Sequence, residues 1–158
     1  MENRSIKITD PNKALEKARS YCQYQEQNHQ EVKEKLYGWG LHKKDVEEIM
    51  AALVTEGFLN EERFAATYAG GKFRIKKWGK QKIKLALKQK KVSDYSINKA
   101  LKEIDDHDYR KTLRAIITKK QKEIKEPVAM KKKYKIAQYL LSRGYEKEMI
   151  WEALGEEE

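Results

Sequence analysis

The sequence predicts an all-α protein in which three tandem three-helix repeats form an elongated, curved, right-handed-turn array. Three observations favour this fold class. Proline occurs only twice in 158 residues, no long stretch alternates apolar with polar residues, and one apolar pattern recurs at offsets of 51 and 53 residues. Because a single repeat of this size buries little apolar surface, neighbouring repeats are expected to share interfaces.

The recurrence is clearest between two blocks of twenty residues. KIKLALKQKKVSDYSINKAL at 82–101 aligns without a gap with KIAQYLLSRGYEKEMIWEAL at 135–154, and residues 31–50 fit the same frame more loosely. In each block the pattern predicts a short amphipathic helix, a sharp turn and a second helix. The turns are expected at Gly40, Lys91 and Gly144, since a residue that ends a helix in this way commonly adopts positive φ.

A further amphipathic helix precedes each block and completes a unit of three helices. These leading helices are predicted at 11–25, 60–76 and about 107–126. Asp10 followed by Pro11 is typical of a helix start, and Ser93 is expected to cap the last helix of the second unit. The resulting division is an extended N-terminal arm, a first repeat, a basic second repeat and a third repeat with an acidic tail, with bounds 1–9, 10–57, 58–105 and 106–158.

The net charge of +10 originates in one segment of the chain. Residues 72–91 contain ten Lys or Arg and no Asp or Glu, whereas the remaining residues are balanced at 25 of each sign. A second basic stretch at 119–135 is offset by acids elsewhere. Concentrated positive charge indicates an anionic partner, such as a nucleic acid or an acidic protein surface, and a solvated helix face is the alternative.

The composition argues against several classes of function. Cys22 is the only cysteine and the three histidines lie far apart, so the chain has no disulfide framework and no zinc-ligand pattern. No Gly-rich phosphate loop and no triad-like arrangement is recognisable. We therefore expect no enzyme activity, no catalytic residue, no metal and no cofactor. Since no apolar run reaches the roughly 18–20 residues that span a bilayer and no secretory signal is present, a cytoplasmic monomer without a membrane partner is expected.

The stretch GFLNEERFA at 57–65 precedes the basic segment and indicates a turn followed by a helix start. Gly57 closes the first unit, Asn60 is a good N-cap, and Phe64 begins the buried face of the next helix. This account leaves only Arg63 without a role. Its side chain is expected to pack on a neighbour, to pair with an acid or to contact a partner, and its spacing does not decide among these.

GFLNEERFA, the basic helix after it, Trp78-Gly79 and KIKLALKQKKVS together resemble the RecX family of bacterial regulators of the RecA recombinase. The matching positions are Gly57, Phe58, Leu59, Asn60, Glu61, Arg63, Phe64 and Ala65, then Gly79, Lys82, Ile83 and Leu87. The resemblance is close in the second unit and looser over residues 10–155. Two departures are Gly70-Gly71 inside a predicted helix and Lys91 where the family usually has Gly.

The resemblance implies a regulator that binds the helical groove of the RecA–single-stranded-DNA filament. Such a protein modulates, and usually inhibits, ATP hydrolysis, filament growth and strand exchange in recombinational DNA repair and the SOS response. The residues expected to contact this partner, or single- or double-stranded DNA, are Arg74, Lys76, Lys77, Lys80, Lys82, Lys84, Lys88, Lys90 and Lys91, with Arg63 and Trp78 as further candidates. A mainly structural role is expected for Gly57, Asn60, Phe64, Gly79, Ile83 and Leu87.

Two alternatives stay open at the level of sequence. A direct nucleic-acid binder would place helices on phosphates with little sequence specificity, since no recognition helix rich in Asn, Gln and Arg is evident. A helical-repeat scaffold for another partner is also compatible, because repeat arrays host many partners.

Overall fold

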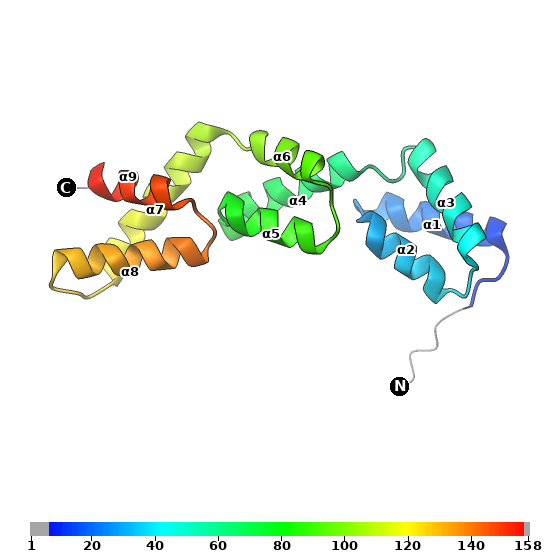
Figure 1. Ribbon diagram of the computed structural model, residues 1–158, viewed down its shortest axis with the longest axis horizontal. Coiled ribbons are helices and arrows are strands. Elements are labelled where there is room, and N and C mark those ends of the chain that lie inside the picture. The colour runs from blue at the N-terminus through cyan, green and yellow to red at the C-terminus, as the bar shows by residue number, and fades with distance from the viewer. Residues whose placement is uncertain (1–6, 157–158) are drawn as a thin grey trace.

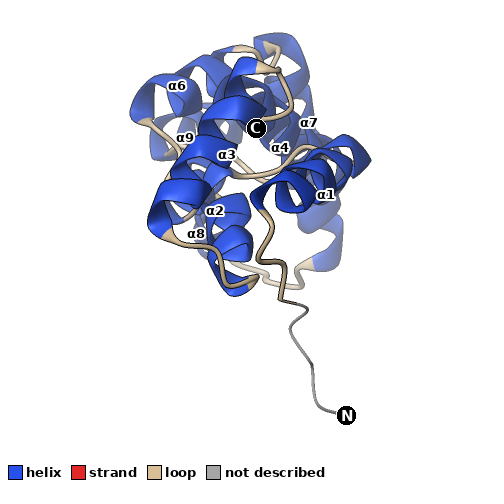
Figure 2. Ribbon diagram, turned by 90° about the vertical axis from the view of Figure 1, so that its right-hand side faces the viewer, coloured by secondary structure: helices blue, strands red, loops and turns tan. Residues whose placement is uncertain are grey.

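The computed structural model describes residues 7–156, which form nine helices and no strand (Figure 2). The helices are α1 (Pro11–Tyr24), α2 (His29–Gly38), α3 (Lys43–Thr55), α4 (Glu61–Lys76), α5 (Lys80–Gln89), α6 (Asp94–Lys102), α7 (Asp106–Glu123), α8 (Ala129–Ser142) and α9 (Lys147–Glu156). The all-α repeat fold predicted from the sequence is confirmed. Most of the predicted arm and the end of the acidic tail lie outside the described residues.

The helices form three units that follow one another along the long axis of the molecule (Figure 1). Within each unit all three helices contact one another: α1 with α2 and α3, α4 with α5 and α6, and α7 with α8 and α9. The molecule is therefore elongated. The unit boundaries that we propose near residues 57 and 105 both fall in loops between helices.

The turn inside each unit has the same backbone conformation. Gly40 and Gly144 have φ of 94° and 97°, and Lys91 has φ of 64° at the equivalent place in the second unit. Lys91 thus adopts the left-handed conformation that glycine adopts at lower cost in the other two units. The sequence pattern predicted this turn correctly at all three positions.

The helix starts use the side chains that the sequence indicated. Asp10, Asn60 and Ser93 each accept a hydrogen bond from a backbone N–H in the first turn of α1, α4 and α6, respectively. Asp105 caps α7 by accepting from the Asp108 N–H at 2.9 Å. These bonds satisfy N–H groups that have no partner within the helix.

The buried side chains form two cores rather than three. One core belongs to α1–α3 and contains Cys22, and the other is shared by α4–α6 and α7–α9. In the shared core the Tyr109 ring lies between two aromatic neighbours, 5.7 Å from Phe73 and 5.2 Å from Tyr145 between ring centroids. The second and third units therefore pack as one body.

Polar contacts connect the first unit to the second. The Asn28 side-chain amide donates to the Lys90 carbonyl at 2.9 Å, and the Lys90 ammonium lies 3.1 Å from the Glu31 carboxylate. The Arg63 guanidinium pairs with the Glu26 carboxylate. Among residues 7–156, none of the helices combines the length and apolarity needed to cross a bilayer.

Candidate functional site

The basic segment changes direction where α4 ends. Lys77 has φ of 59° and closes α4, with its N–H donating to the Phe73 carbonyl at 3.0 Å. Gly79 then becomes the N-cap of α5. Because of this turn, Lys76 and Lys77 do not share a helix face with the lysines of α5.

The third unit holds the turn in place through the backbone. The Gly79 N–H donates to the Arg143 carbonyl at 2.7 Å, and the Gln81 N–H donates to the Gly144 carbonyl at 2.9 Å. The bonds join the end of the α4–α5 loop and the first turn of α5 to the loop between α8 and α9. The two loops are therefore fixed relative to one another.

Side chains of the third unit bind the carbonyls at the end of α4. The Tyr145 hydroxyl donates to the Lys77 carbonyl at 2.8 Å, and the Arg143 guanidinium donates to the Lys76 carbonyl. The Lys77 ammonium itself donates to the Arg74 carbonyl at 2.9 Å. These donors satisfy carbonyls at the end of α4 that have no partner within the helix.

Tyr109 connects the same two units from inside. Its hydroxyl donates to the Glu146 carboxylate at 2.7 Å and accepts from the Lys80 N–H at 2.9 Å. Burial, together with the hydrogen bond to Glu146, raises the pKa of Tyr109 far above that of an exposed tyrosine. The phenol is therefore held in its neutral form, in which it can donate to Glu146.

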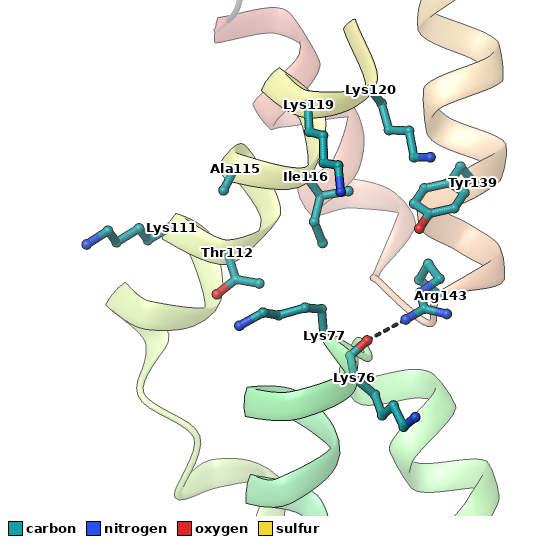
Figure 3. A pocket seen from close by; sticks show the side chains of 10 residues that line it. All are labelled: Lys76, Lys77, Lys111, Thr112, Ala115, Ile116, Lys119, Lys120, Tyr139 and Arg143. Atoms are coloured by element: carbon teal, nitrogen blue, oxygen red, sulfur yellow. Dashed lines mark hydrogen bonds between the residues drawn. The ribbon is translucent and has the colours of Figure 1, made fainter. Parts of the chain in front are cut away.

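An open cleft of about 420 Å3 lies among the end of α4, α7 and α8 (Figure 3). Its lining carries six cationic side chains and no acidic one: Lys76, Lys77, Lys111, Lys119, Lys120 and Arg143. Thr112, Ala115, Ile116 and Tyr139 complete the lining and give it a partly apolar floor. We refer to it as the α4/α7/α8 cleft.

Most cations of the cleft have no carboxylate partner. In the described part of the chain, Lys119 and Lys120 are the cleft residues that form ion pairs, both with Glu123, at 3.9 and 3.1 Å. The Lys120 ammonium also lies 4.1 Å from the centroid of the Tyr139 ring. The charge of the other four is not neutralised within residues 7–156, so the cleft is a site of concentrated positive potential.

The predicted basic residues of α5 divide between two flanks. Lys80, Lys84 and Lys88 follow one another at intervals of four and share a side, whereas Lys82 lies on the opposite side. Lys90, which follows α5, pairs with Glu31 of the first unit. The structure thus brings Lys76 and Lys77 together with cations of the third unit and not with most of their neighbours in sequence.

The remaining predicted basic residues lie away from the cleft opening. Lys91 occupies the turn before α6 and is exposed. Arg74 is exposed on α4, and its guanidinium covers Gly70, where an added Cβ would lie 2.7 Å from Nη1. Lys88 lies 3.9 Å from Asp94. No common surface for all nine predicted residues is apparent from these contacts.

Trp78 is half-buried and packs against the shared core. The ammonium groups of Lys72 and Lys82 lie 5.0 and 4.7 Å from its ring centroid. A base stacking on Trp78 would therefore have to displace a lysine that already interacts with the ring.

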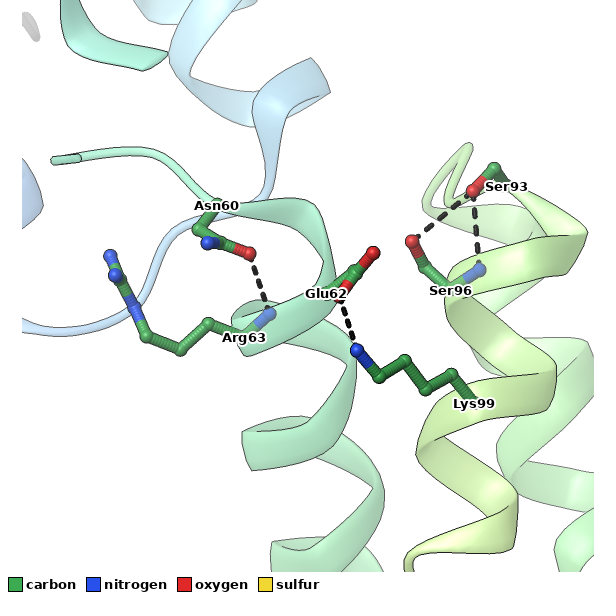
Figure 4. Close-up of polar contacts among 6 residues, drawn as sticks. All are labelled: Asn60, Glu62, Arg63, Ser93, Ser96 and Lys99. Carbon is green, nitrogen blue, oxygen red and sulfur yellow. Dashed lines mark hydrogen bonds and ion pairs between the residues drawn. The ribbon is translucent and has the colours of Figure 1, made fainter. Parts of the chain in front are cut away.

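Arg63 points toward the first unit and away from α6 (Figure 4). Its N–H donates to the Asn60 side chain at 2.9 Å, and its guanidinium contacts both the Glu26 carboxylate and, at 3.0 Å, the Gly57 carbonyl. On the other side of the same helix start, Glu62 pairs with Lys99 of α6 at 2.7 Å. Of the roles open to Arg63, the structure shows the pairing with an acid.

The residues of the GFLNEERFA and KIKLALKQKKVS stretches for which a mainly structural role was predicted lie in turns or in the core. Gly57 has φ of 81°, Phe64 is 8% exposed, and Ile83 and Leu87 have no exposed surface. Sequence reasoning missed Lys111 and Arg143 as members of a basic site, because each lies outside both basic stretches. Only the packing of α7 and α8 against the end of α4 brings them to Lys76.

Two family models match the chain. The model described as RecX, second three-helix domain, matches residues 60–101, and the model described as RecX, third three-helix domain, matches residues 108–154. Together they cover more than half of the 158 residues. The chain belongs to the RecX family.

Curated relatives and solved structures agree with this assignment. Regulatory protein RecX of Prosthecochloris aestuarii is 30% identical over 148 residues, covering 94% of this chain and 95% of the relative. Regulatory protein RecX of Clostridium acetobutylicum is 31% identical over 147 residues, covering 90% and 66%. The crystal structure of RecX from Lactobacillus salivarius superimposes with a TM-score of 0.86 at 25% identity, covering 92% of this chain and 95% of that one. The chain spans about half the length of some other RecX relatives, such as that of Bacillus cereus, at 51%.

Proposed function

We propose that this protein, a RecX family member, is a cytoplasmic regulator that binds the RecA–single-stranded-DNA filament and inhibits its ATP hydrolysis, growth and strand exchange. The observation that carries the proposal is the match of both the second and the third unit to RecX domains. The relatives of this chain bear the name of regulatory proteins. In this role the protein acts by binding and changes no covalent bond.

The shape of the molecule suits a long partner. Three units follow one another along one axis, and the second and third share a core that keeps them in fixed register (Figure 1). An array of this kind can contact successive RecA protomers along a filament, and linked contacts raise affinity without any one of them being strong. The unpaired cations at the end of α4 supply attraction to an anionic assembly.

The decisive experiment measures DNA-dependent ATP hydrolysis and strand exchange by RecA with this protein at substoichiometric ratio. We expect both activities to fall while most of the DNA stays covered by RecA. The affinity of the protein for free single-stranded DNA is titrated against salt in parallel. If inhibition appears only at concentrations that saturate naked DNA, regulation through the filament is wrong.

A direct nucleic-acid binder is the second candidate function. The α4/α7/α8 cleft favours it, since four of its six cations have no carboxylate partner within residues 7–156. Binding of this kind would be nonspecific in sequence and steeply salt-dependent. The parallel titration distinguishes the two candidates, because a pure DNA binder inhibits RecA only by competing for DNA.

A further inference from the structure

We propose that the α4/α7/α8 cleft is a binding site for single-stranded nucleic acid that accommodates one nucleotide, with its phosphates on the cations and its base against Ile116 and Tyr139. Three elements from two units converge on this cleft (Figure 3). Its third-unit residues, 111–143, are distant in sequence from the basic segment at 72–91. The inference concerns the free protein and does not depend on RecA.

The arrangement of the cations fits a phosphodiester chain. Lys76 and Lys77 stand on the α4 side of the cleft, Lys111 and Lys119 on α7, and Arg143 directly after α8. A strand that runs through the cleft therefore meets positive charge on more than one side. Each phosphate contacted releases condensed counterions, which is the main source of affinity in such sites.

Several of these groups are held in position before any ligand binds. Arg143 is fixed by its bond to the Lys76 carbonyl, and Lys77 by its bond to the Arg74 carbonyl. The Lys120 ammonium rests over the Tyr139 ring at 4.1 Å. Because these side chains have already lost rotamer freedom, less entropy is lost when an anion arrives.

The floor of the cleft favours a nucleotide over an acidic peptide. Ile116, Ala115 and Tyr139 offer apolar and aromatic surface between the cations. A nucleobase is planar and can lie on such a surface, whereas Asp and Glu side chains bring no flat apolar group. The volume of about 420 Å3 is also in the range of clefts that enclose small organic ligands.

A single strand fits the cleft better than a duplex, because only an unpaired base can reach its apolar floor. In a duplex the bases are stacked and paired inside, so only phosphates and groove edges could reach the cleft. An unpaired strand can turn one base toward Tyr139 while its phosphates stay on the lysines.

Glu123 opposes anion binding at the edge of the cleft. Its carboxylate pairs with Lys119 and Lys120, and it lies at the end of α7. Removing this charge frees both ammonium groups for a ligand. The inference therefore predicts a gain of affinity from Glu123→Gln, which a loss of structure cannot produce.

The binding test uses fluorescence anisotropy of an oligothymidylate of about 15 nucleotides with the full chain. The triple variant K76Q/K111Q/K119Q is compared with K13Q/K33Q/K44Q, which removes the same charge from exposed positions of the first unit. We expect the cleft variant to bind about tenfold more weakly and its slope of log affinity against log salt to fall by about 2, at ~0.7 per phosphate. The control should change by less than about twofold. Equal losses in both variants would overturn the site.

Glu123→Gln is tested in the same assay against Glu47→Gln, which removes the acid of an exposed Lys43–Glu47 pair in the first unit. Glu123→Gln should tighten binding of the oligonucleotide by about twofold or more. Glu47→Gln should tighten it only by the small amount that any loss of one negative charge produces.

Polyglutamate of matched charge serves as competitor. If it displaces the oligonucleotide as well as unlabelled oligothymidylate does, the cleft takes an acidic chain and the proposal is wrong.

Photocrosslinking locates the strand. An oligonucleotide carrying 5-iododeoxyuridine is irradiated with the protein, and adducts are mapped by mass spectrometry. The expected adduct is on Tyr139, which is 36% exposed, while Tyr24 at 86% and Tyr95 at 67% should stay unmodified despite their greater exposure. Adducts on Tyr24 or Tyr95, without one on Tyr139, would overturn the assignment.

Discussion

Gly79 and Gly144 meet backbone to backbone where the second and third units join. A Cβ added to Gly79 would lie 2.3 Å from the Gly144 carbonyl carbon, and a Cβ added to Gly144 would lie 2.4 Å from the Lys82 Cβ. Gly79 has φ of −76°, which any residue can adopt. Close approach, and not backbone conformation, is therefore the reason for glycine at this position of the family motif.

Gly79→Ala should weaken the joint between the second and third units. The added methyl group meets backbone atoms that cannot move without breaking the Gly79–Arg143 hydrogen bond, so we expect a loss of about 1–3 kcal/mol in unfolding free energy. Gly71→Ala is the matched control, because nothing lies within 4 Å of its added Cβ. In a helix interior that change should be neutral or stabilising by up to about 1 kcal/mol. Denaturant unfolding compares the two, and equal effects would exclude close packing as the cause.

Phe64→Ala should destabilise the core shared by the second and third units. Phe64 is 8% exposed, and its ring lies 5.9 Å from that of Tyr68. Loss of the ring should cost about 3–5 kcal/mol. Thermal unfolding followed by circular dichroism measures the loss. A variant as stable as the parent would show that the ring contributes little to the core.

Arg63→Ala should loosen the attachment of the first unit while leaving the other two intact. Arg63 is 45% exposed and pairs with Glu26, which is 25% exposed, so the pair contributes about 0.2–1 kcal/mol. Hydrogen exchange should rise at Glu26 and Gly57 and stay unchanged in α7–α9. In a double-mutant cycle with Glu26→Gln, the second change should add little to the first. Full additivity would mean that the two side chains do not interact in solution.

Glu61 should make stability depend on pH in the acid range. Burial alone would raise the pKa of Glu61, but hydrogen bonds from the Ser93 hydroxyl and N–H, with a further one from Ser96, lower it below its ordinary value of 4.5. A lowered folded-state pKa contributes stability above the unfolded-state value, and this stability is lost as pH falls through the folded-state value. Glu61→Gln should therefore cost about 1 kcal/mol at neutral pH and progressively less below pH ~4.5. A cost that stays constant with pH would mean that the charge of Glu61 is not involved.

Much of the fold follows from local sequence features. The recurring apolar pattern predicted the helices, and Asp10, Asn60 and Ser93 predicted their starts, because capping depends on neighbours within one turn. Even the turn at Lys91, which lacks glycine, was predicted from its place in the repeat. Helix ends were less well predicted: α1 ends at Tyr24 rather than at residue 25, and α7 ends at Glu123 rather than near residue 126.

The candidate site could be predicted only in part. Lys76 and Lys77 belong to the conspicuous basic segment, but the sequence does not show that Lys77 ends α4 in a left-handed turn and so separates them from the lysines of α5. Lys111 and Arg143 reach the cleft through contacts between residues more than 30 positions apart in the chain, such as that of Arg143 with Lys76. Local pattern carries no information about contacts of this range.

The most direct test of the proposed function is electron cryomicroscopy of RecA–single-stranded-DNA filaments saturated with this protein. We predict elongated helical density along the filament groove, with the second and third units related as in Figure 1 and contacts to more than one RecA protomer. Density confined to filament ends, or protein found only on DNA that has lost RecA, would contradict the account.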